Sequence, residues 1–564
     1  MVNNGYSARK FVFFDLILKI TKYYVIIPLI STRCAVLRYF AERRRLMNVS
    51  TFYSAAVRGI DGIIVTVEAT AAASSTPRMD IIGLPDTAVK ESQGRVRSAA
   101  RTLNLNLKKG VLTVNLAPAD IRKEGTVYDL PILLSLIDEP GLSKCDFSDA
   151  CFIGELSLSG DLRPVNGVLP MAVAARDAGL KKIFVPIENA SEASAAKGLL
   201  VYPVRNAMEV VRHYLTPERI LPKTFKESDF ITESSGIKLD FADVKGQDSA
   251  KKALEIAAAG AHNVLLIGPP GSGKSMLASR VPDILPPITL EESIQTSKIY
   301  SIAGHTSELT PLLSKRPFRS PHHSLSAAAL IGGGTNPRPG EISLANNGVL
   351  FLDEFPEFDK HACEVLRQPI EERTVTISRV NGTVEYPCSF MLICAMNPCR
   401  CGYYGHPTKP CNCSPQARNA YLARISGPIL DRIDIQVEVS ALAFSELDTT
   451  VARESSEAIR ERVGRAREFA MSRFDGEKLA NGLPLTANAH MQPKHIRKFC
   501  ITDDGAKALL HQAFDRLGLS ARGYDRILKV ARTVADFDES DIIKKQHVAV
   551  AVQMRSLDRK YFKF

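Results

Sequence analysis

The eight residues from Gly268 to Ser275 constrain the fold of this 564-residue chain more than any other feature. They fit the pattern GxxxxGK[ST], directly after the apolar run 264–267 and before the helix-forming run 276–278. Glycines let backbone N–H groups close around phosphate oxygens, while the Lys neutralises the β and γ oxygens and the Ser holds Mg²⁺. The context predicts a phosphate-binding loop on a buried parallel strand. The predicted loop consists of Gly268, Pro269, Pro270, Gly271, Ser272, Gly273, Lys274 and Ser275.

A second motif completes the predicted nucleotide site. The apolar run 349–352 ends in Asp353 and Glu354. Asp353 is suited to Mg²⁺, mostly through water, and Glu354 to polarising the attacking water during hydrolysis. Asn397 follows a third apolar run, 390–395, and is suited to positioning that water. Two acids after a strand usually mark a solvated turn, but together with the phosphate loop they predict an ATP hydrolase that uses ATP and Mg²⁺.

Four of the eleven cysteines fall within fifteen residues. Cys399, Cys401, Cys411 and Cys413 are interspersed with Gly and Pro, and four thiolates so close in sequence predict a tetrahedral Zn²⁺ site. The CxC spacing is tighter than the usual CxxC, and His406 is a spare ligand. The alternative is a loop with four reduced cysteines. The other cysteines are scattered, which excludes a disulfide scaffold and favours the cytoplasm.

A β-hairpin is predicted between Glu354 and Asn397. Residues 374–379 and 383–386 have strand character, and Asn381-Gly382 forms a typical hairpin turn. Arg379 is the cation nearest the tip. The hairpin is either a substrate-contacting element or a structural one, in which Arg379 pairs across it with Glu385.

The net charge of +11 is unevenly distributed. Residues 1–46 hold nine Lys or Arg and two acids, so residues 47–564 carry only +4 net. Global charge therefore does not predict nucleic-acid binding. The first 46 residues contain no uncharged stretch longer than ten residues, whereas a membrane helix needs about 20. We expect no membrane association, with a signal anchor as the alternative, and interpret 1–46 as an extension before a natural start at Met47.

Hydrophobic patterning predicts an α/β protein with several domains. Strands are expected at 62–68, 111–116 and 182–186, with a helix at 172–178 closed by Gly179. After residue 441 only helical spacing remains, at 450–475, 503–517, 521–536 and 544–558. The expected organisation is an extension (1–46), an α/β domain (47–215), a linker (216–240), an α/β ATPase domain (241–440) and a helical C-terminal domain (441–564).

Several longer motifs resemble the magnesium-chelatase-like branch of AAA+ ATPases, and residues 53–558 as a whole look like the YifB/ComM family. The motifs that carry the resemblance are Gly246-Gln247, 316–323, 329–334, 339–344, 397–402, 430–434 and 519–528. The resemblance implies a homo-oligomeric ring, a hexamer, with ATP bound between subunits. ComM-like members drive branch migration of DNA, which implies a helicase whose partner is branched or single-stranded DNA.

The same resemblance assigns roles to residues that spacing alone leaves open. By analogy Asn397 is sensor 1, Arg432 is the arginine finger, with Arg424 as second choice, and Arg522 is sensor 2. A lone Arg is usually a surface residue, so these roles depend on the resemblance. One of the arginines is expected to act from a neighbouring subunit.

The first α/β domain resembles the Lon protease domain but departs from it at both catalytic positions. Where the protease has its serine this chain has Val127 or Tyr128, and where it has its lysine this chain has 169–171, Leu-Pro-Met. Without nucleophile and base the serine–lysine chemistry cannot run. The expected function is an ATP-driven DNA motor. The alternatives are a metal-chelatase motor subunit, an ATP-dependent protease, which these substitutions oppose, and a protein-remodelling ATPase.

Overall fold

The computed structural model describes residues 49–139, 141–225, 239–306, 312–334, 337–379, 382–441 and 453–562. The predicted extension 1–46, its start at Met47, most of the linker and Asn381 of the hairpin turn lie outside these residues. The described chain forms two compact units, one within residues 49–224 and one made mainly of residues from 239 onward. Among the described residues, no helix combines the length and apolar character that a membrane crossing requires.

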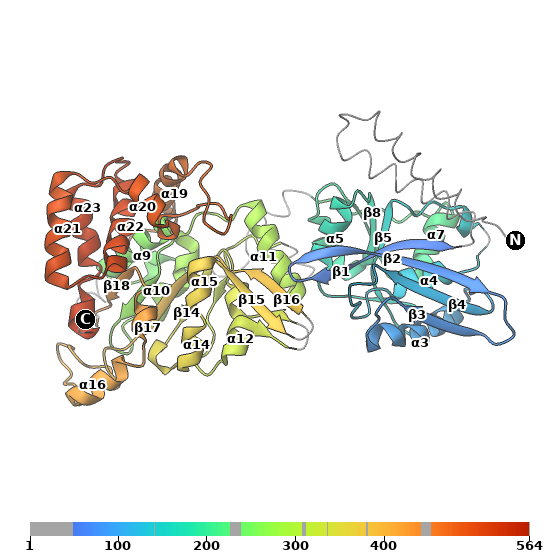
Figure 1. The fold of residues 1–564 in the computed structure, drawn as a ribbon, viewed down its shortest axis with the longest axis horizontal. Coiled ribbons are helices and arrows are strands. Elements are labelled where there is room, and N and C mark those ends of the chain that lie inside the picture. The colour runs from blue at the N-terminus through green and yellow to red at the C-terminus, as the bar shows by residue number, and fades with distance from the viewer. Residues whose placement is uncertain are drawn as a thin grey trace, which may run out of the picture. The chain divides into compact units, whose positions relative to one another are not determined.

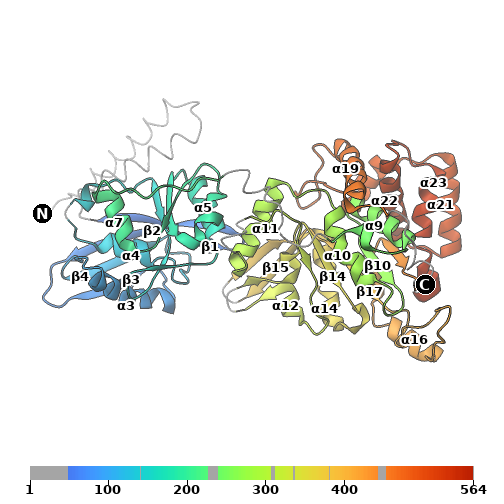
Figure 2. The same cartoon turned by 180° about the vertical axis from the view of Figure 1, so that it is seen from behind.

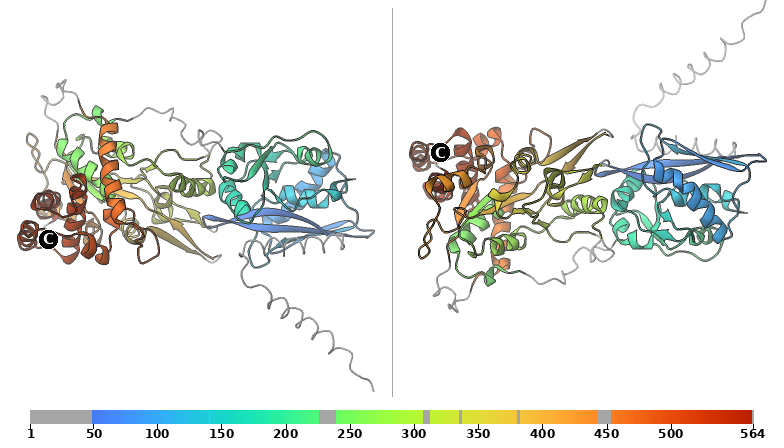
Figure 3. Two further views of the ribbon diagram at one scale, coloured as in Figure 1. Left: turned by 90° about the horizontal axis from the view of Figure 1, so that it is seen from above. Right: turned by 90° about the horizontal axis from the view of Figure 1, so that it is seen from below.

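The first unit is built on a seven-stranded sheet of order β3-β4-β2-β1-β5-β8-β9. β1, β5, β8 and β9 run parallel, whereas β2 and β4 pair antiparallel. Helix α3 packs against β3 and α4, and Figure 3 shows the blue and cyan helices of this unit beside its strands. The elements are β1 (Ser50–Arg58), β2 (Asp61–Ala72), β3 (Arg78–Ile82), α3 (Thr87–Thr102), β4 (Val111–Ala117), α4 (Asp129–Leu136), β5 (Ala150–Phe152), β6 (Glu155–Leu156), β7 (Leu162–Arg163), α5 (Val168–Asp177), β8 (Lys182–Pro186), α6 (Ala190–Ser194), β9 (Leu200–Val204) and α7 (Ala207–Leu215).

The second unit contains a parallel five-stranded sheet of order β11-β14-β17-β10-β18. Its elements before residue 441 are α9 (Asp248–Gly260), β10 (Val264–Ile267), α10 (Lys274–Ile284), α11 (Leu290–Ala303), β11 (Phe318–Arg319), α12 (Ala327–Ile331), β12 (Gly332–Gly333), β13 (Arg338–Pro339), α13 (Glu341–Leu344), β14 (Val349–Leu352), α14 (Lys360–Glu364), α15 (Arg367–Glu372), β15 (Thr374–Arg379), β16 (Gly382–Pro387), β17 (Met391–Met396), α16 (Pro415–Leu422), α17 (Gly427–Leu430) and β18 (Ile435–Glu438).

The three central strands of this sheet, β14, β17 and β10, are apolar on both faces, and their successive residues enter two different cores. Val264 and Leu266 pack with α9, α10 and the C-terminal helices. Leu265 and Ile267 pack with residues of α12, α13 and α17. This division follows from the two-residue repeat of a strand. Figure 2 shows α9 and α10 beside β10. Layers on both faces make the uninterrupted apolar runs stable as parallel strands.

The C-terminal helices continue the first of these two cores. They are α19 (Ser456–Arg473), α20 (Pro493–Phe499), α21 (Asp504–Leu517), α22 (Ala521–Phe537) and α23 (Lys545–Gln553), and α21 to α23 lie together near the C-terminus (Figure 1). α19 packs against both α9 and α10, and α22 packs against α9. The helical region therefore belongs to the same compact unit as the parallel sheet.

The predicted fold class is confirmed: the chain has an N-terminal sheet domain, a parallel five-stranded core and a helical C-terminal region. The runs 264–267 and 349–352 form β10 and β14, and the third run forms β17, one residue later than predicted. The hairpin strands are β15 and β16, with Arg379 opposite Gly382. The short strands β1, β3, β5 and β9 were not predicted.

Candidate nucleotide-binding site

The phosphate loop joins the end of β10 to the first turn of α10. Gly271 and Gly273 have φ of +74° and +91°, in the left-handed region that favours glycine. Gly273 is the N-cap of α10, so the unpaired N–H groups and the positive end of the helix dipole adjoin the loop. At Gly268 an added Cβ would lie 2.2 Å from the carbonyl oxygen of Val439. This backbone is suited to binding phosphate.

Lys274, the first residue of α10, is held by three oxygen acceptors. Its ammonium donates to the carbonyl oxygens of Gly268 at 2.8 Å and Pro269 at 2.9 Å, and to Asn397 Oδ1 at 3.1 Å. Burial lowers the pKa of Lys274, and the two carboxylates after β14 oppose that shift. The ammonium already joins the loop to Asn397, and phosphate oxygens would be stronger, charge-assisted acceptors for it.

Two contacts test whether the site fits a nucleotide with Mg²⁺. Ser275 Oγ donates to Asp353 Oδ2 at 2.6 Å. The hydroxyl and the carboxylate that are expected to hold Mg²⁺ are therefore adjacent. Ser272 Oγ is buried, and among the described residues it has no hydrogen-bond partner. A phosphate oxygen would supply one. Both observations fit a nucleotide bound with Mg²⁺. When bound, Mg²⁺ would neutralise charge on the β and γ phosphate oxygens.

The predicted loop, acids and sensor line one cavity of about 390 Å³. It brings together three strand ends, those of β10, β14 and β17. Met276 and Met396 also line it, and neither was predicted. The lining residues are Pro270, Gly271, Ser272, Gly273, Lys274, Ser275, Met276, Asp353, Glu354, Met396 and Asn397.

Glu354 has a partner that the sequence did not reveal. Its Oε2 lies 3.2 Å from Nδ1 of His323, whose ring packs on His322 with centroids 4.1 Å apart. The only sequence signal was that both histidines end the motif 316–323. His323 reaches Glu354 because β11, which ends shortly before it, pairs with β14. Glu354 itself has φ of +50°, a strained value for a residue with a side chain.

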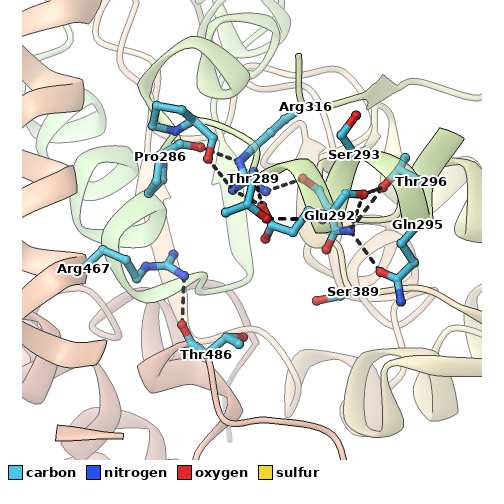
Figure 4. A network of polar contacts seen from close by, with 12 residues as sticks. Pro286, Thr289, Glu292, Ser293, Gln295, Thr296, Arg316, Ser389, Arg467 and Thr486 are labelled. Atoms are coloured by element: carbon cyan, nitrogen blue, oxygen red, sulfur yellow. Dashed lines mark hydrogen bonds and ion pairs between the residues drawn. The ribbon is translucent and has the colours of Figure 1, made fainter. Parts of the chain in front are cut away.

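Arg316 anchors the beginning of the same motif (Figure 4). It donates to the carbonyl oxygens of Pro286 at 2.6 Å and Asn347 at 2.8 Å, and to the carboxylate of Glu292 at 2.9 Å. Glu292 also forms a capping box with Thr289 at the start of α11. This network fixes the segment that leads into β11, and so supports the position of His323.

Arg432 and Arg522 do not line the nucleotide cavity. Both line a second cavity of about 370 Å³, together with residues of α15, α20 and α22 and the residue just before β18. Arg432 is buried, forms an ion pair with Glu371 at 2.6 Å and donates to two backbone carbonyls. Arg522 is two-thirds exposed and lies 4.0 Å from Asp431. The second-choice residue, Arg424, lines neither cavity.

The second cavity is rich in cations. Arg373, Arg526 and Lys529 line it beside the two predicted arginines, whereas only three carboxylates do. Burial lowers the pKa of Arg373 and of Arg526 to about 10. Arg424, which does not line this cavity, pairs with Glu357 at 2.7 Å. An excess of positive charge in a cavity is suited to an anion such as a phosphate.

Comparison with known proteins identifies the family. Family profiles match in three blocks: "Subunit ChlI of Mg-chelatase" at 67–189, "Magnesium chelatase, subunit ChlI" at 240–447, and "Magnesium chelatase, subunit ChlI C-terminal" at 453–555. The competence protein ComM of Haemophilus influenzae is 40% identical over 523 residues, covering 91% of this chain and 98% of ComM. The chain belongs to the ComM/YifB family. A YifB protein of Escherichia coli is likewise 40% identical, over 518 residues, covering 91% of this chain and 98% of its own length.

Membership in the ComM/YifB family settles the type of ATPase. These are magnesium-chelatase-like AAA+ proteins, so ATP hydrolysis is implied for the site built around the phosphate loop. The ChlI subunit of Cyanidium caldarium is a more distant relative, 23% identical over 287 residues, which cover 46% of this chain and 75% of that subunit.

The four predicted cysteine ligands gather beside the nucleotide site of this ComM/YifB chain. All four Sγ atoms lie within 4.8 Å of one another. The Sγ atom of Cys399 lies 3.3 Å from that of Cys401 and 3.7 Å from that of Cys411. Tetrahedral Zn–S bonds of about 2.3 Å require sulfur separations of roughly 3.8 Å, so the cluster fits Zn²⁺. His406 is outside the cluster and accepts from backbone N–H groups of its own turn.

Protonation within the cluster is also suited to a metal. Burial raises the pKa of Cys399 to about 12. Burial acts the same way on Cys401, but hydrogen bonds outweigh it and lower the pKa of that thiol to about 6. A lowered pKa favours the thiolate of Cys401, and the thiolate is the form of cysteine that binds metal.

Substitutions at Lys274 and Glu354 test the nucleotide site. Lys274→Ala should abolish ATP binding, because it removes the cation on the β and γ oxygens. Glu354→Gln should bind ATP but lower kcat by about 100-fold or more, because the base that polarises water is lost. Binding of a fluorescent ATP analogue and release of phosphate are the measurements. A Glu354→Gln protein that hydrolyses ATP at the parent rate would show that Glu354 is not the base.

Proposed function

We propose that this protein is an ATP-driven ring motor that acts on DNA in the cytoplasm, as a branch-migration helicase of the ComM type. The proposal has three parts: hydrolysis in the nucleotide cavity, completion of that cavity by a neighbouring subunit, and a grip on DNA by hairpins. The observation that carries the DNA part is an arginine-bearing pair of hairpins beside the ATPase core.

Hydrolysis follows from the arrangement of side chains in the nucleotide cavity. Lys274 binds the β and γ oxygens, and Asn397, which it already contacts, orients water near the γ-phosphate. Glu354 accepts a proton from that water as its oxygen attacks the γ-phosphorus. The bond between the γ-phosphorus and the bridging oxygen breaks, and ADP leaves with that oxygen. His323 keeps the Glu354 carboxylate in place.

A neighbouring subunit completes the site in this proposal. Among the described residues, no arginine lines the nucleotide cavity, whereas Arg432 and Arg522 share a separate cavity on the same chain. If both act on the transferring phosphate, both must reach the nucleotide of another subunit. In the sequence-based expectation only one arginine acts on a neighbouring subunit, whereas this proposal assigns that role to both. The arrangement requires a closed homo-oligomeric ring, with six subunits as expected for the family.

Mixing two inactive variants tests this arrangement. Arg522→Ala removes an exposed side chain and leaves the phosphate loop intact, while Lys274→Ala leaves Arg522 intact. We expect each variant alone to be inactive and mixed rings to hydrolyse ATP, since one interface then combines an intact loop with an intact Arg522. Phosphate release at several mixing ratios is the measurement. Mixed rings that form but stay inactive at every ratio would place Arg522 in its own subunit's site.

Two short hairpins form the proposed DNA-binding surface. Tyr386 of β16 donates to the carbonyl oxygen of Pro337 at 3.0 Å, which joins the β15–β16 hairpin to β12–β13. Arg338 and Arg379 are both exposed on these hairpins. An added Cβ at Gly333 would lie 3.1 Å from Arg379 Nη2, so the Arg379 side chain lies over β12. Exposed arginines on neighbouring hairpins are suited to DNA phosphates.

The described residues do not support the structural alternative, in which Arg379 pairs with Glu385 across the hairpin. Glu385 is opposite Thr376, three residues before Arg379. Among the described residues, Arg379 donates to the carbonyl oxygen of Ser378 and forms no ion pair with an acid. Its guanidinium is therefore not neutralised by the hairpin.

We expect Arg379→Ala to leave basal ATP turnover near the parent value and to abolish stimulation by branched DNA. Loss of a phosphate contact should also reduce the salt dependence of DNA binding. Glu385→Gln is the control, because it removes a negative charge from the same hairpin instead of a positive one. It should therefore tighten DNA binding. ATP turnover and DNA affinity at several salt concentrations are the measurements. If the parent protein shows no DNA-stimulated turnover, the protein-remodelling or chelatase-type alternatives replace the DNA proposal.

The first unit takes no part in proteolysis in this proposal. At the positions where a Lon-type domain has nucleophile and base, this chain has Val127 or Tyr128 and the sequence Leu-Pro-Met at 169–171. Tyr128 and Met171 are buried, and neither residue type supplies an activated nucleophile of the serine–lysine kind.

We expect purified protein to contain about one zinc per chain, and to lose it when Cys399 and Cys411 are both changed to Ser. Cys145→Ser is a control, because Cys145 is a free cysteine of the first unit. Elemental analysis of reduced protein that was never exposed to chelator is the measurement. Absence of metal from that material would mean that the cluster is four reduced thiols.

A further inference from the structure

The cysteine loop, residues 399–413, begins two residues after Asn397, which lines the nucleotide cavity. Two residues before its first thiol, Asn397 accepts from the Lys274 ammonium at 3.1 Å. The residue before Asn397, Met396, accepts from the backbone N–H of Gly268 at 3.1 Å. Cys399 itself is fully buried. The end of β17 that holds Asn397 therefore continues directly into the metal-binding cluster.

The loop then returns to touch the phosphate loop. Gly402 has φ of +83°, and an added Cβ there would lie 2.4 Å from Cδ and 2.7 Å from Cγ of Pro270. Pro270 lines the nucleotide cavity. The backbone at Gly402 thus packs directly against the wall of the ATP site, at a place where no larger residue fits.

Among the described residues, few other contacts hold the cysteine loop, and one is the donation from Arg418 Nη1 to the carbonyl oxygen of Cys413 at 3.3 Å. Tyr404 is one anchor, through the Arg418 guanidinium 4.3 Å from its ring centroid and through the ring of Tyr561. Residues 405–412 form no helix or strand and are largely exposed. Closing such a segment costs conformational entropy, and four bonds to one metal ion would offset that cost by joining both ends of the loop.

We propose that the cysteine loop, when its four thiolates hold a thiophilic divalent cation such as Zn²⁺, positions the phosphate loop through Gly402 and Pro270 and so sets the affinity for ATP. This rests on the metal site proposed above. The metal then acts at a distance from the phosphates, as a structural support for Pro270, and touches neither nucleotide nor Mg²⁺. Losing the metal frees Gly402 from Pro270 and weakens nucleotide binding.

Two glycine substitutions separate the packing contact from backbone strain. Gly402→Ala inserts a methyl group against Pro270 and leaves all four thiols unchanged. Gly405→Ala is the matched control, because Gly405 has nearly the same φ, +77°, in the same loop, and its Cβ would meet nothing within 4 Å. We expect Gly402→Ala to keep its zinc and to bind a fluorescent ATP analogue at least 10-fold more weakly. Gly405→Ala should keep both zinc and parent affinity.

A third variant removes the metal without touching the contact. Cys411→Ser with Cys413→Ser changes the two thiols farthest along the chain from Asn397. We expect this protein to lose zinc and to bind the analogue at least 10-fold more weakly, with its melting temperature measured alongside to confirm that it is folded. Parent protein stripped of zinc should show the same loss, and added ZnCl₂ should restore affinity when Mg²⁺ is supplied equally to every sample.

The outcomes distinguish the two proposals. Parent protein without any metal refutes the metal site itself. Parent protein with zinc, whose removal leaves nucleotide affinity within 2-fold of the starting value, keeps the metal site and overturns the positioning role. Gly402→Ala that binds the analogue as tightly as Gly405→Ala overturns it as well.

Discussion

The parallel pairing of β17 with both β10 and β14 is the constraint on which the ATP site depends. Ile267 is opposite Met396, and Leu352 is opposite Cys394. Because parallel strands end at the same edge of a sheet, the segments that follow these three strands meet there. Successive residues of each strand enter different cores, so a slip of one residue would exchange the two sets. The register of the site is therefore fixed by the packing of both faces.

The C-terminal helices contact the opposite edge of the sheet, where β10 and β18 begin, through buried polar contacts as well as apolar ones. Asp434 lies 3.4 Å from His262, whose other ring nitrogen is 2.8 Å from Thr533 Oγ1 in α22. Burial would raise the pKa of Asp434, but His262 and Arg526 outweigh it and hold that pKa at about 2. An ionised, buried carboxylate thus ties the start of β18 to α22. The elements that carry Arg432 and Arg522 are thereby held in a fixed relation.

The sequence predicts those parts of the site that are marked by short local motifs. The phosphate loop, Asp353-Glu354 and Asn397 each combine an apolar strand with a specific residue type just after it, and the structure brings them to one cavity. The fold class followed from the same strands and from the loss of strand patterning after residue 441. The short strands of the first unit were missed because three to nine residues of mixed character give a weak periodic signal.

Contacts between distant segments were beyond the sequence. His323 reaches Glu354 only because β11 pairs with β14, and nothing in the spacing of the two residues indicates it. The packing of Gly402 on Pro270 likewise joins residues 132 positions apart. Motifs predict which residues carry chemistry, whereas the partners that hold those residues depend on tertiary packing.

Arg432 and Arg522 share a cavity but differ in readiness to bind a phosphate. Arg522 is exposed and 4.0 Å from its nearest acid, a separation at which an exposed pair contributes little. Arg432 is buried, pairs with Glu371 at 2.6 Å and donates to two carbonyls. Moving it onto a phosphate would leave these acceptors unpaired, and each charge-assisted hydrogen bond is worth about 1.5–3 kcal/mol. Arg522 can therefore engage a neighbouring nucleotide first, while Arg432 follows only where the assembled ring supplies new partners for Glu371.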